Sequence, residues 1–302
     1  MHSIKTALIQ GYKKLFSVNI NSAHLDAELL LSFVLHKSRE YILAHSDKIL
    51  INKQADKFNN LIKQRAKHIP VAYLIHEKEF YGRTFYVDER VLVPRPETEQ
   101  IIEEFRNQNL KIKNNTTIVD VGTGSGCIII TLVKELEKQK NIKFFAIDIS
   151  KDALIIARKN ARLHDVSTKI TFLQGSLLEP ILKNKKFLIH NSEFLILANL
   201  PYLTPAQIKN SPFIKHEPRL ALTADKDGLK YYRKLAKQIQ NFYHCDPAPR
   251  KGREKQSRHK ITLICEIDPA QVKGIKKIFS FAKSTETKKD LAGLDRIVVI
   301  KF

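Results

Sequence analysis

Beyond residue 115, short apolar segments alternate with longer amphipathic segments, and this alternation constrains the fold more than any other feature of the sequence. Short apolar, β-branched runs are typical of strands, whereas apolar residues spaced three and four apart are typical of helices. The segments that predict strands are 116–121, 143–147, 170–173, 194–198, 261–267 and 296–302, and those that predict helices are 127–137, 151–164, 231–242 and 269–281.

Alternating strands and helices are typical of a mostly parallel sheet that carries helices on both faces. We therefore predict an α/β fold of the Rossmann-like type for residues 96–302. This order of elements also allows the last strand to run antiparallel. Open α/β sheets bind ligands at the carboxyl ends of their strands, so functional residues are expected in the loops that follow the strands.

Residues 1–72 have a different, helical pattern. Apolar residues have helix-like spacing in segment 23–35, and Ser22 is in position to cap that helix. A second helix is predicted over residues 53–68 and ends before Pro70, because the residue that precedes a proline avoids helical backbone. We predict a small helical-bundle domain here.

Residues 73–95 are expected to link the two domains. Aromatic and β-branched residues on both sides of Gly82 predict a β-hairpin. The segment 93–99, Val-Pro-Arg-Pro-Glu-Thr-Glu, is stiffened by its two prolines. Its acidic residues suit the first turn of the next helix, because the helix dipole favours negative charge there.

The chain carries 52 Lys and Arg against 31 Asp and Glu, a formal net charge of +21. Such a surplus of positive charge is consistent with weak contact with RNA, a ribosome or an RNA-bound protein. A Lys-rich composition without any binding role explains the same net charge. Residues 243–260 contain six basic and two acidic residues with two prolines. They predict a mobile basic loop, either solvated or in contact with RNA or a partner.

Three cysteines, Cys127, Cys245 and Cys265, form no C-x-x-C pair, so neither a zinc site nor a disulfide framework is expected. We expect no metal and a reducing, cytoplasmic location. No apolar stretch approaches the ~18 residues of a membrane span, and the first residues lack the apolar region of a signal peptide. A monomer is the expected state.

A glycine-rich turn, Gly122-Thr123-Gly124-Ser125-Gly126, follows the first strand of the sheet domain. Glycines at this turn let the backbone approach a cofactor closely. Asp148 ends the second strand about 20 residues further on, where a carboxylate can accept both ribose hydroxyls of an adenosine. Enzymes that use NAD and enzymes that use S-adenosylmethionine both have this arrangement.

The loop Asn199-Leu200-Pro201-Tyr202 follows the fourth strand. Asn199 offers an amide oxygen as a hydrogen-bond acceptor. Pro201 favours extended backbone at Leu200, which can present its carbonyl as a second acceptor. Two acceptors suit an NH2 group, and Tyr202 offers a flat face to a planar group.

These features favour methyl transfer to a planar nitrogen, with S-adenosylmethionine as the donor. An amide nitrogen is a poor nucleophile because its lone pair is delocalised, whereas the sulfonium methyl is already electrophilic. The protein has mainly to hold nitrogen and methyl in line and to stabilise the charge that develops on nitrogen. No strong general base is required, since the proton can leave late.

Six features in order resemble the peptide-chain release factor glutamine methyltransferase family over nearly the whole chain. The Pro-Arg-Pro-Glu-Thr-Glu sequence is the most specific of them, whereas the glycine-rich turn is widely shared. The features are segment 93–99, the turn 122–126, Asp148, the loop 199–202, Glu-Pro-Arg-Leu-Ala-Leu at 217–222 and Asp-Gly-Leu at 227–229.

The resemblance implies a class I methyltransferase fold that methylates N5 of the glutamine in the Gly-Gly-Gln motif of class I release factors. The helical domain would dock the release factor, segment 93–99 would close over the cofactor, and segment 174–177 would flank its adenine. The implied cofactor contacts are Gly122, Thr123, Gly124, Ser125, Gly126, Asp148, Ile149, Ser176, Leu177 and Asn199. The implied substrate contacts are Asn199, Leu200, Pro201 and Tyr202, and Asn199, Pro201 and Tyr202 are the implied catalytic residues.

Leu200 departs from the Asn-Pro-Pro-Tyr that is usual in this family. Its carbonyl survives, and the lost rigidity corresponds to roughly 0.4–1 kcal/mol. Asn-Leu-Pro-Tyr is also similar to the loop of ribosomal-RNA adenine dimethyltransferases, whose target amino group offers the same two donors. The alternatives are therefore an RNA adenine-N6 methyltransferase, a ribosomal-protein glutamine methyltransferase and an RNA-binding protein with a decayed site.

Overall fold

The computed structural model describes residues 3–108, 116–184, 193–209, 211–244 and 260–302. The chain forms two compact units. The helical unit contains residues 1–77, 87–89 and 211–216, and the sheet unit contains residues 78–86, 90–210 and 217–302. The basic segment predicted at 243–260 lies, apart from its ends, outside the described residues, as does Cys245.

The helical unit has the helices that the sequence predicts, packed around an apolar core. Asp26 is buried in this unit and accepts a hydrogen bond from the Arg65 guanidinium at 2.7 Å. Ser22 does not cap the backbone of its helix, because its hydroxyl donates to Asp26 instead. The helices are α1 (Ile4–Phe16), α2 (Ala23–Leu35), α3 (Arg39–Ala44), α4 (Asn52–Arg65), α5 (Val71–Ile75) and the short 3-10 turn η3 (Pro212–Ile214).

The predicted hairpin is present as strands β1 (Lys78–Phe80) and β2 (Arg83–Phe85). Phe80 and Phe85 are fully buried in a core cluster of the sheet unit. Burial of these two rings makes the hairpin part of the sheet unit.

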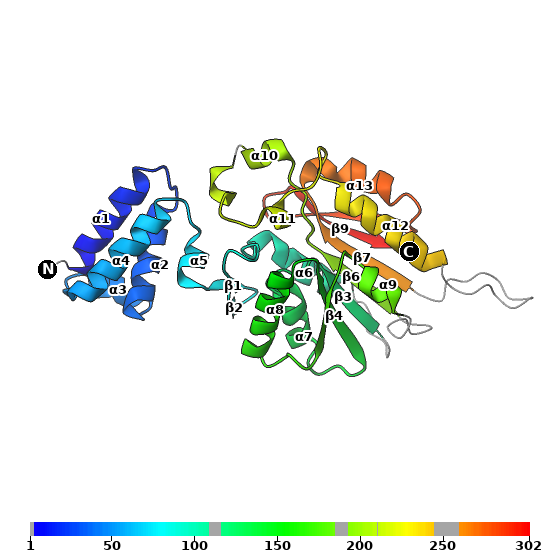
Figure 1. Cartoon of the computed structure of the whole chain (residues 1–302), viewed down its shortest axis with the longest axis horizontal. Helices are drawn as coiled ribbons and strands as arrows, with labels where there is room; N and C mark the ends of the chain where they lie inside the picture. Colours follow the sequence, from blue (N-terminus) through cyan, green and yellow to red (C-terminus); the bar gives the residue numbers. More distant parts are fainter. Residues whose placement is uncertain (1–2, 109–115, 185–192, 210, 245–259) are drawn as a thin grey trace, which may run out of the picture. The chain divides into compact units, whose positions relative to one another are not determined.

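The sheet unit contains, among the described residues, a seven-stranded sheet in the order β5-β4-β3-β6-β7-β9-β8 (Figure 1). The first five strands in that order are parallel, whereas β9 runs antiparallel to β7 and β8 antiparallel to β9. The predicted α/β class is therefore confirmed, and the final strand runs antiparallel, as the order of elements allowed. The strands are β3 (Thr116–Val121), β4 (Ile142–Asp148), β5 (Ile170–Gln174), β6 (Glu193–Ala198), β7 (Lys260–Glu266), β8 (Ser284–Lys289) and β9 (Asp295–Lys301).

Helices cover both faces of this sheet (Figure 1). Successive residues of a strand point to opposite faces. Val119 accordingly packs in a cluster with residues of α12 and α13, whereas Ile118 packs in a cluster with residues of α6 and α7. The helices are α6 (Gln100–Asn107) after the 3-10 turn η1 (Pro96–Glu99), α7 (Cys127–Glu135), α8 (Lys151–Leu163), α9 (Glu179–Lys183), α10 (Pro205–Lys209), α11 (Arg219–Leu222), α12 (Lys230–His244) and α13 (Val272–Ile278), which follows the 3-10 turn η4 (Pro269–Gln271).

Among the elements that differ from the sequence prediction, two lie within residues 269–289. The single helix expected over 269–281 is a 3-10 turn followed by the shorter α13. Strand β8 was not predicted, because its sequence Ser-Thr-Glu-Thr-Lys-Lys has no apolar alternation. It lies at the edge of the sheet, where charged residues are common because they discourage pairing with other chains.

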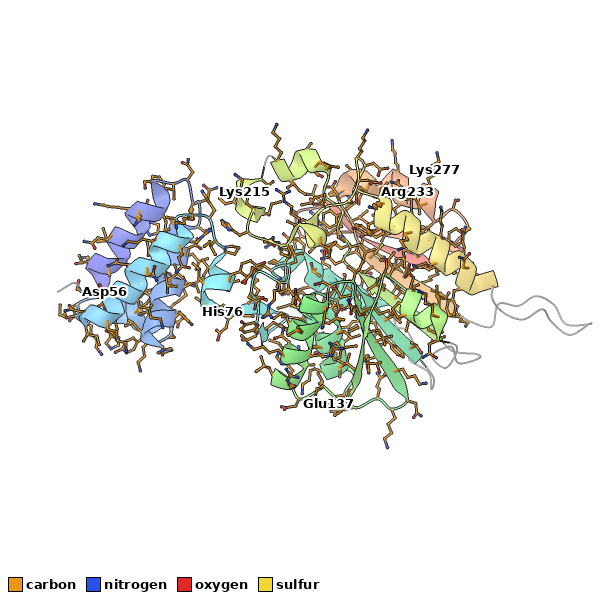
Figure 2. All side chains as sticks on the ribbon, viewed as in Figure 1. Asp56, His76, Glu137, Lys215, Arg233 and Lys277 are labelled. Carbon is orange, nitrogen blue, oxygen red and sulfur yellow. The ribbon has the colours of Figure 1, made fainter. Side chains whose placement is uncertain are left out.

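Charged side chains lie on the outside of both units (Figure 2). Glu137, beyond the end of α7, and Lys277, on α13, are both exposed. Within the described segments, no helix is long and apolar enough to cross a membrane.

Candidate active site

The register of the sheet brings three strand ends to one edge. Val121 of β3 pairs with Ala198 of β6 on one side and with Ile147 of β4 on the other. The next residues along these chains include Gly122, Asp148 and Asn199. Strand order reverses between β3 and β6, which is the position where open α/β sheets bind ligands.

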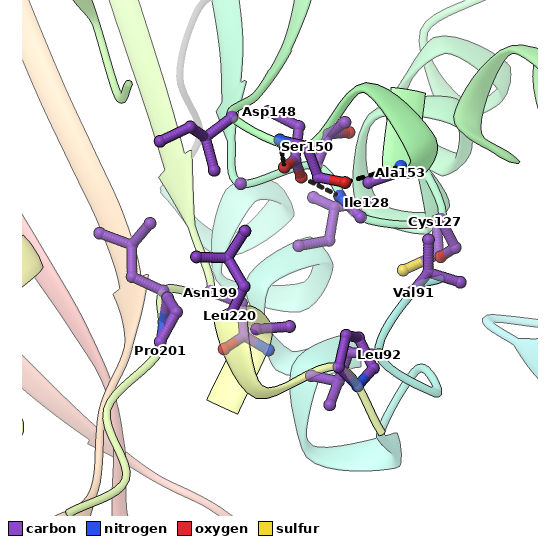
Figure 3. Close-up of a pocket in the computed structure, with 18 of the residues that line it drawn as sticks. Val91, Leu92, Cys127, Ile128, Asp148, Ser150, Ala153, Asn199, Pro201 and Leu220 are labelled. Atoms are coloured by element: carbon purple, nitrogen blue, oxygen red, sulfur yellow. Dashed lines mark hydrogen bonds between the residues drawn. The ribbon is translucent and has the colours of Figure 1, made fainter. Parts of the chain in front are cut away.

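A cavity of about 180 Å³ opens at this edge, within the sheet unit. Figure 3 shows Asp148 and Ser150 on one side of the cavity, and Asn199 and Pro201 on another. Most of the residues that the sequence singled out line this cavity together. They are Gly122, Thr123, Gly124, Ser125, Asp148, Ile149, Ser176, Leu177, Asn199, Leu200 and Pro201; Gly126 and Tyr202 are not among the lining residues.

Hydrogen bonds to the neighbouring strand hold the glycine-rich turn. The N–H groups of Gly122 and Thr123 donate to the Ile147 carbonyl at 2.8 and 3.0 Å. Gly126, the N-cap of α7, has a positive φ of 82°. A Cβ there would lie 3.0 Å from the Ile130 side chain, so this glycine serves helix packing, whereas the first two glycines face the cavity.

Asp148 joins the turn to the start of α8. One carboxylate oxygen accepts the Gly124 N–H and the other accepts the Ser150 N–H, both at 2.9 Å. Burial raises the pKa of Asp148, and these backbone hydrogen bonds oppose the rise. Each carboxylate oxygen keeps a second lone pair for a ligand hydroxyl. The exposed apolar side chain of Ile149 lies next to it on the cavity wall.

Two buried polar residues support the turn from behind. The Asn160 amide nitrogen donates to the carbonyls of Ser125 at 2.8 Å and Tyr86 at 2.9 Å, and its oxygen accepts the Tyr86 N–H at 2.8 Å. Asp120 accepts a hydrogen bond from the Thr123 hydroxyl at 2.6 Å. Its burial raises the pKa of this carboxyl to about 7.

Asn199 has a defined orientation. Its amide nitrogen donates to the Thr98 hydroxyl oxygen and to Glu266 Oε2, each at 2.9 Å. Both amide N–H bonds are therefore used within the protein, and we find no partner for the amide oxygen among the described residues. The amide oxygen is therefore left as the acceptor of this cavity residue.

Tyr202 and Leu200 occupy different surroundings. The Tyr202 hydroxyl donates to Glu266 Oε1 at 3.0 Å, and burial together with this carboxylate raises its pKa. Its ring packs against the core instead of lining the cavity. The Leu200 side chain is buried beside the turn, 3.4 Å from the position of a Cβ on Gly122.

The loop is anchored after Tyr202 by the Asp-Gly-Leu feature. The Tyr202 carbonyl accepts a hydrogen bond from Gln271 Nε2 at 3.0 Å, and the same nitrogen donates to the Asp227 carbonyl at 3.3 Å. Gly228 fits against both groups, because a Cβ there would lie 2.2 Å from the Tyr202 carbonyl oxygen.

The segment 93–99 is held by Glu217 of the Glu-Pro-Arg feature. This buried carboxylate accepts hydrogen bonds from the Arg95 guanidinium at 2.5 Å and the Val93 N–H at 3.4 Å. Pro94, Arg95 and Thr98 line the cavity. Arg95 and Glu217 are 122 residues apart in the chain, yet the two features to which they belong form parts of one cavity wall.

Glu266, Asn160 and the cavity residue Ser150 were not predicted as site residues. Glu266 carried a signal in the sequence, since it is an acidic residue at the end of an apolar strand. Asn160 had none, because it lies within a helix. In the described part of the chain, no group of three His, Cys, Asp or Glu side chains could hold a metal ion.

Comparisons with known proteins cover both units. Residues 6–75 match the PrmC N-terminal domain family, and residues 112–240 match a methyltransferase domain family. A release factor glutamine methyltransferase of Dictyoglomus turgidum is 35% identical over 305 residues, which cover 98% of each chain. One of Flavobacterium psychrophilum is 32% identical over 307 residues, covering 98% of this chain and 99% of the relative.

Among solved structures, the hMettl16 catalytic domain in complex with the MAT2A 3'UTR hairpin 1 is similar, with a TM-score of 0.53. It is 13% identical, and the match covers 90% of each chain. At this identity the similarity concerns the fold alone.

Proposed function

Because the chain belongs to the release factor glutamine methyltransferase family, we propose that it methylates the side-chain amide nitrogen, N5, of the glutamine in the Gly-Gly-Gln motif of class I release factors. The family resemblance expected from the motifs is confirmed. The chain is an S-adenosylmethionine-dependent protein-glutamine methyltransferase.

The orientation of Asn199 is the observation that carries the proposal. Its amide oxygen is the acceptor left for a ligand, since both amide hydrogens are donated to Thr98 and Glu266. With the Leu200 carbonyl as a second acceptor, the loop suits the two N–H donors of a glutamine NH2 group. We assign Asn199 and Pro201 to binding and orienting this group.

Tyr202 has a different part in the proposed site. The sequence suggests a ring that packs on the substrate amide, but the hydroxyl of Tyr202 is fixed by Glu266 and the ring borders the core. We propose that Tyr202 holds the end of the loop in place, so that the acceptors at 199 and 200 keep their spacing.

The cavity fits S-adenosylmethionine by the chemistry of its walls. Asp148 has lone pairs left for ribose hydroxyls, Ile149 offers an apolar surface for a planar base, and the glycine-rich turn has no side chains to block close approach. Ser176 and Leu177 complete the proposed adenine side. When bound, the cofactor supplies an electrophilic methyl group.

The protein's own contribution is to bind and orient. Two acceptors hold both hydrogens of the amide nitrogen, so they fix its direction and stabilise the positive charge that develops on it. Water is a sufficient final acceptor for the proton, because the charged nitrogen is strongly acidic. We propose further that the helical unit docks the release factor and that segment 93–99 covers the cofactor.

The function is tested with labelled S-adenosylmethionine, a class I release factor, ribosomal RNA and ribosomal protein in one mixture. We expect label in the release factor, and loss of that label when the Gly-Gly-Gln glutamine is replaced by alanine. Label found only in the RNA or only in ribosomal protein would overturn the proposal.

A matched pair of variants tests the role of Asn199. Asn199→Ala is expected to lower kcat about 100-fold or more, as loss of a transition-state hydrogen-bond partner does elsewhere. Asn241→Ala, on the exposed side of α12, is the control and should leave kcat unchanged. Activity of Asn199→Ala close to that of the control would contradict the assigned role.

A further inference from the structure

We propose that Glu266 is a positioning residue, which fixes the Asn199 side chain with its oxygen toward the substrate nitrogen. This proposal rests on the proposed function, because it assumes a substrate nitrogen. The orientation of the Asn199 side chain, however, is a property of the protein without substrate. Glu266 is only 1% exposed and belongs to β7, the parallel neighbour of β6.

An asparagine side chain alone does not determine which of its two ends faces a ligand. Rotation by about half a turn exchanges the oxygen with the NH2 group, and the two ends have nearly the same shape. In the exchanged orientation Asn199 would present donors to the donors of the substrate amide, and binding would be lost. The neighbours of Asn199 must therefore discriminate between the two ends.

Glu266 and Thr98 provide this discrimination. Glu266 Oε2 receives hydrogen bonds from the Asn199 amide at 2.9 Å and from the Thr98 hydroxyl at 2.6 Å. The Thr98 hydroxyl has thus donated its hydrogen and can only accept from Asn199, which it does at 2.9 Å. Both groups beside Asn199 are acceptors, so an oxygen turned toward them would be repelled twice.

The remaining contacts keep Glu266 an acceptor. Its second oxygen, Oε1, receives the Tyr202 hydroxyl at 3.0 Å. Burial raises the pKa of Glu266, and the hydrogen bonds from Thr98 and Tyr202, together with the positive charge of Arg296 on β9, oppose that rise. In all three hydrogen bonds the carboxylate oxygens are the acceptors. The Tyr232 hydroxyl donates to the Glu266 backbone carbonyl, which fixes the main chain.

Glu266 also joins two points of the Asn199–Tyr202 loop. One carboxylate oxygen binds the first residue of the loop and the other binds the last. A single buried side chain from a neighbouring strand therefore sets both the direction of Asn199 and the span of the loop.

The first test is a double-mutant cycle measured by single-turnover methyl transfer. Glu266→Gln keeps the shape of the side chain but adds a donor, so that both orientations of Asn199 become available. We expect it to lower the transfer rate about 30-fold in the wild-type background, and less than about 3-fold in the Asn199→Ala background. Equal losses in the two backgrounds would overturn the proposal, since Glu266 would then not act through Asn199.

Thr98 supplies a conservative rescue. Thr98→Val removes the hydroxyl at nearly constant shape and is expected to lower the rate about 10-fold, whereas Thr98→Ser retains the hydroxyl and should stay within about 3-fold of wild type. The dissociation constant for S-adenosylmethionine should change less than about 3-fold in Glu266→Gln. If cofactor affinity in Glu266→Gln fell by as large a factor as the transfer rate, the substitution would have disrupted the whole site. That result would contradict the proposal.

A second test needs no substrate. The two side-chain amide hydrogens of Asn199, identified by their absence in Asn199→Ala, should exchange slowly with water in the wild type and at least about 10-fold faster in Thr98→Val and Glu266→Gln. Equal exchange in all three proteins would overturn the proposal. If wild-type protein failed to methylate any release factor, the proposed function would fall, while this measurement would still decide the role of Glu266.

Discussion

Gly228 allows the contribution of one close contact to be separated from the cost of its backbone conformation. The residue has a φ of 73°, and a Cβ there would lie 2.1 Å from Gln271 Nε2 and 2.2 Å from the Tyr202 carbonyl oxygen. Gly293 has a similar φ of 79°, but nothing lies within 4 Å of its Cβ position. Replacing either glycine by alanine therefore adds a similar backbone strain. Only the replacement at Gly228 also adds steric clashes.

The expected magnitudes follow from these geometries. A residue with a Cβ in left-handed backbone costs about 1–2 kcal/mol, which both variants share. Gly228→Ala adds about 1–3 kcal/mol for overpacking and about 1 kcal/mol for the hydrogen bond between Gln271 and Tyr202. We expect Gly228→Ala to lower the free energy of unfolding by about 2–4 kcal/mol more than Gly293→Ala does.

Urea unfolding of both variants and the wild type measures this difference. Single-turnover methyl transfer adds a second readout, because displacement of the Tyr202 carbonyl by about 1 Å should lower the rate about 100-fold in Gly228→Ala alone. If the two variants unfolded within about 0.5 kcal/mol of each other, the close contact at Gly228 would not exist, and the reasoning would be refuted.

Three further predictions concern the cavity and the residue that supports its glycine-rich turn. The pKa of Asp120 is about 7 in the folded protein, against about 3.9 in the unfolded chain. Between these two values the folded state keeps a proton on Asp120 that the unfolded state has lost. The free energy of unfolding should therefore fall by ~4 kcal/mol as the pH rises from about 4 to 7. Asp120→Asn should remove this slope in urea titrations, and an unchanged slope would exclude Asp120 as its source. Asp148→Asn should weaken S-adenosylmethionine about 10-fold or more by calorimetry, whereas the exposed Asp152→Asn should not; equal affinities would contradict the ribose assignment. Leu200→Pro keeps the carbonyl, so kcat should stay within about 3-fold in steady-state assays, and a 10-fold loss would show that the leucine itself is needed.

The parts of the site that could be predicted from the sequence are those that follow directly from one strand. Gly122, Asp148 and Asn199 each stand at or just beyond a strand end, and parallel strands bring such residues to one edge whatever else the fold does. Local pattern and the rule of parallel sheets were sufficient for these three residues.

Glu266 could not be assigned in this way, although it too stands at a strand end. Its role depends on β7 being the neighbour of β6 and on the direction of two side chains, and neither follows from strand positions alone. For Tyr202, too, the direction of the side chain could not be predicted from the sequence. Its ring was expected to face the substrate, whereas packing and the Glu266 hydrogen bond turn it toward the core.

Strand β8 escaped prediction for a different reason. Its six residues contain no large apolar side chain, so no periodicity marks them as a strand. Pairing with β9 supplies the stabilisation instead, and tertiary context therefore decides the backbone conformation.

Asn160 joins two main-chain segments of the sheet unit that lie far apart in the sequence. It bonds the main chain of Tyr86 and the main chain of Ser125 at once, and residues 87–89, which directly follow Tyr86 in the chain, belong to the helical unit. A ligand that displaced Ser125 and a partner that displaced Tyr86 would each strain hydrogen bonds of the same side chain. If cofactor and partner binding are coupled through Asn160, the coupling is reciprocal: the factor by which the cofactor changes partner affinity equals the factor by which the partner changes cofactor affinity.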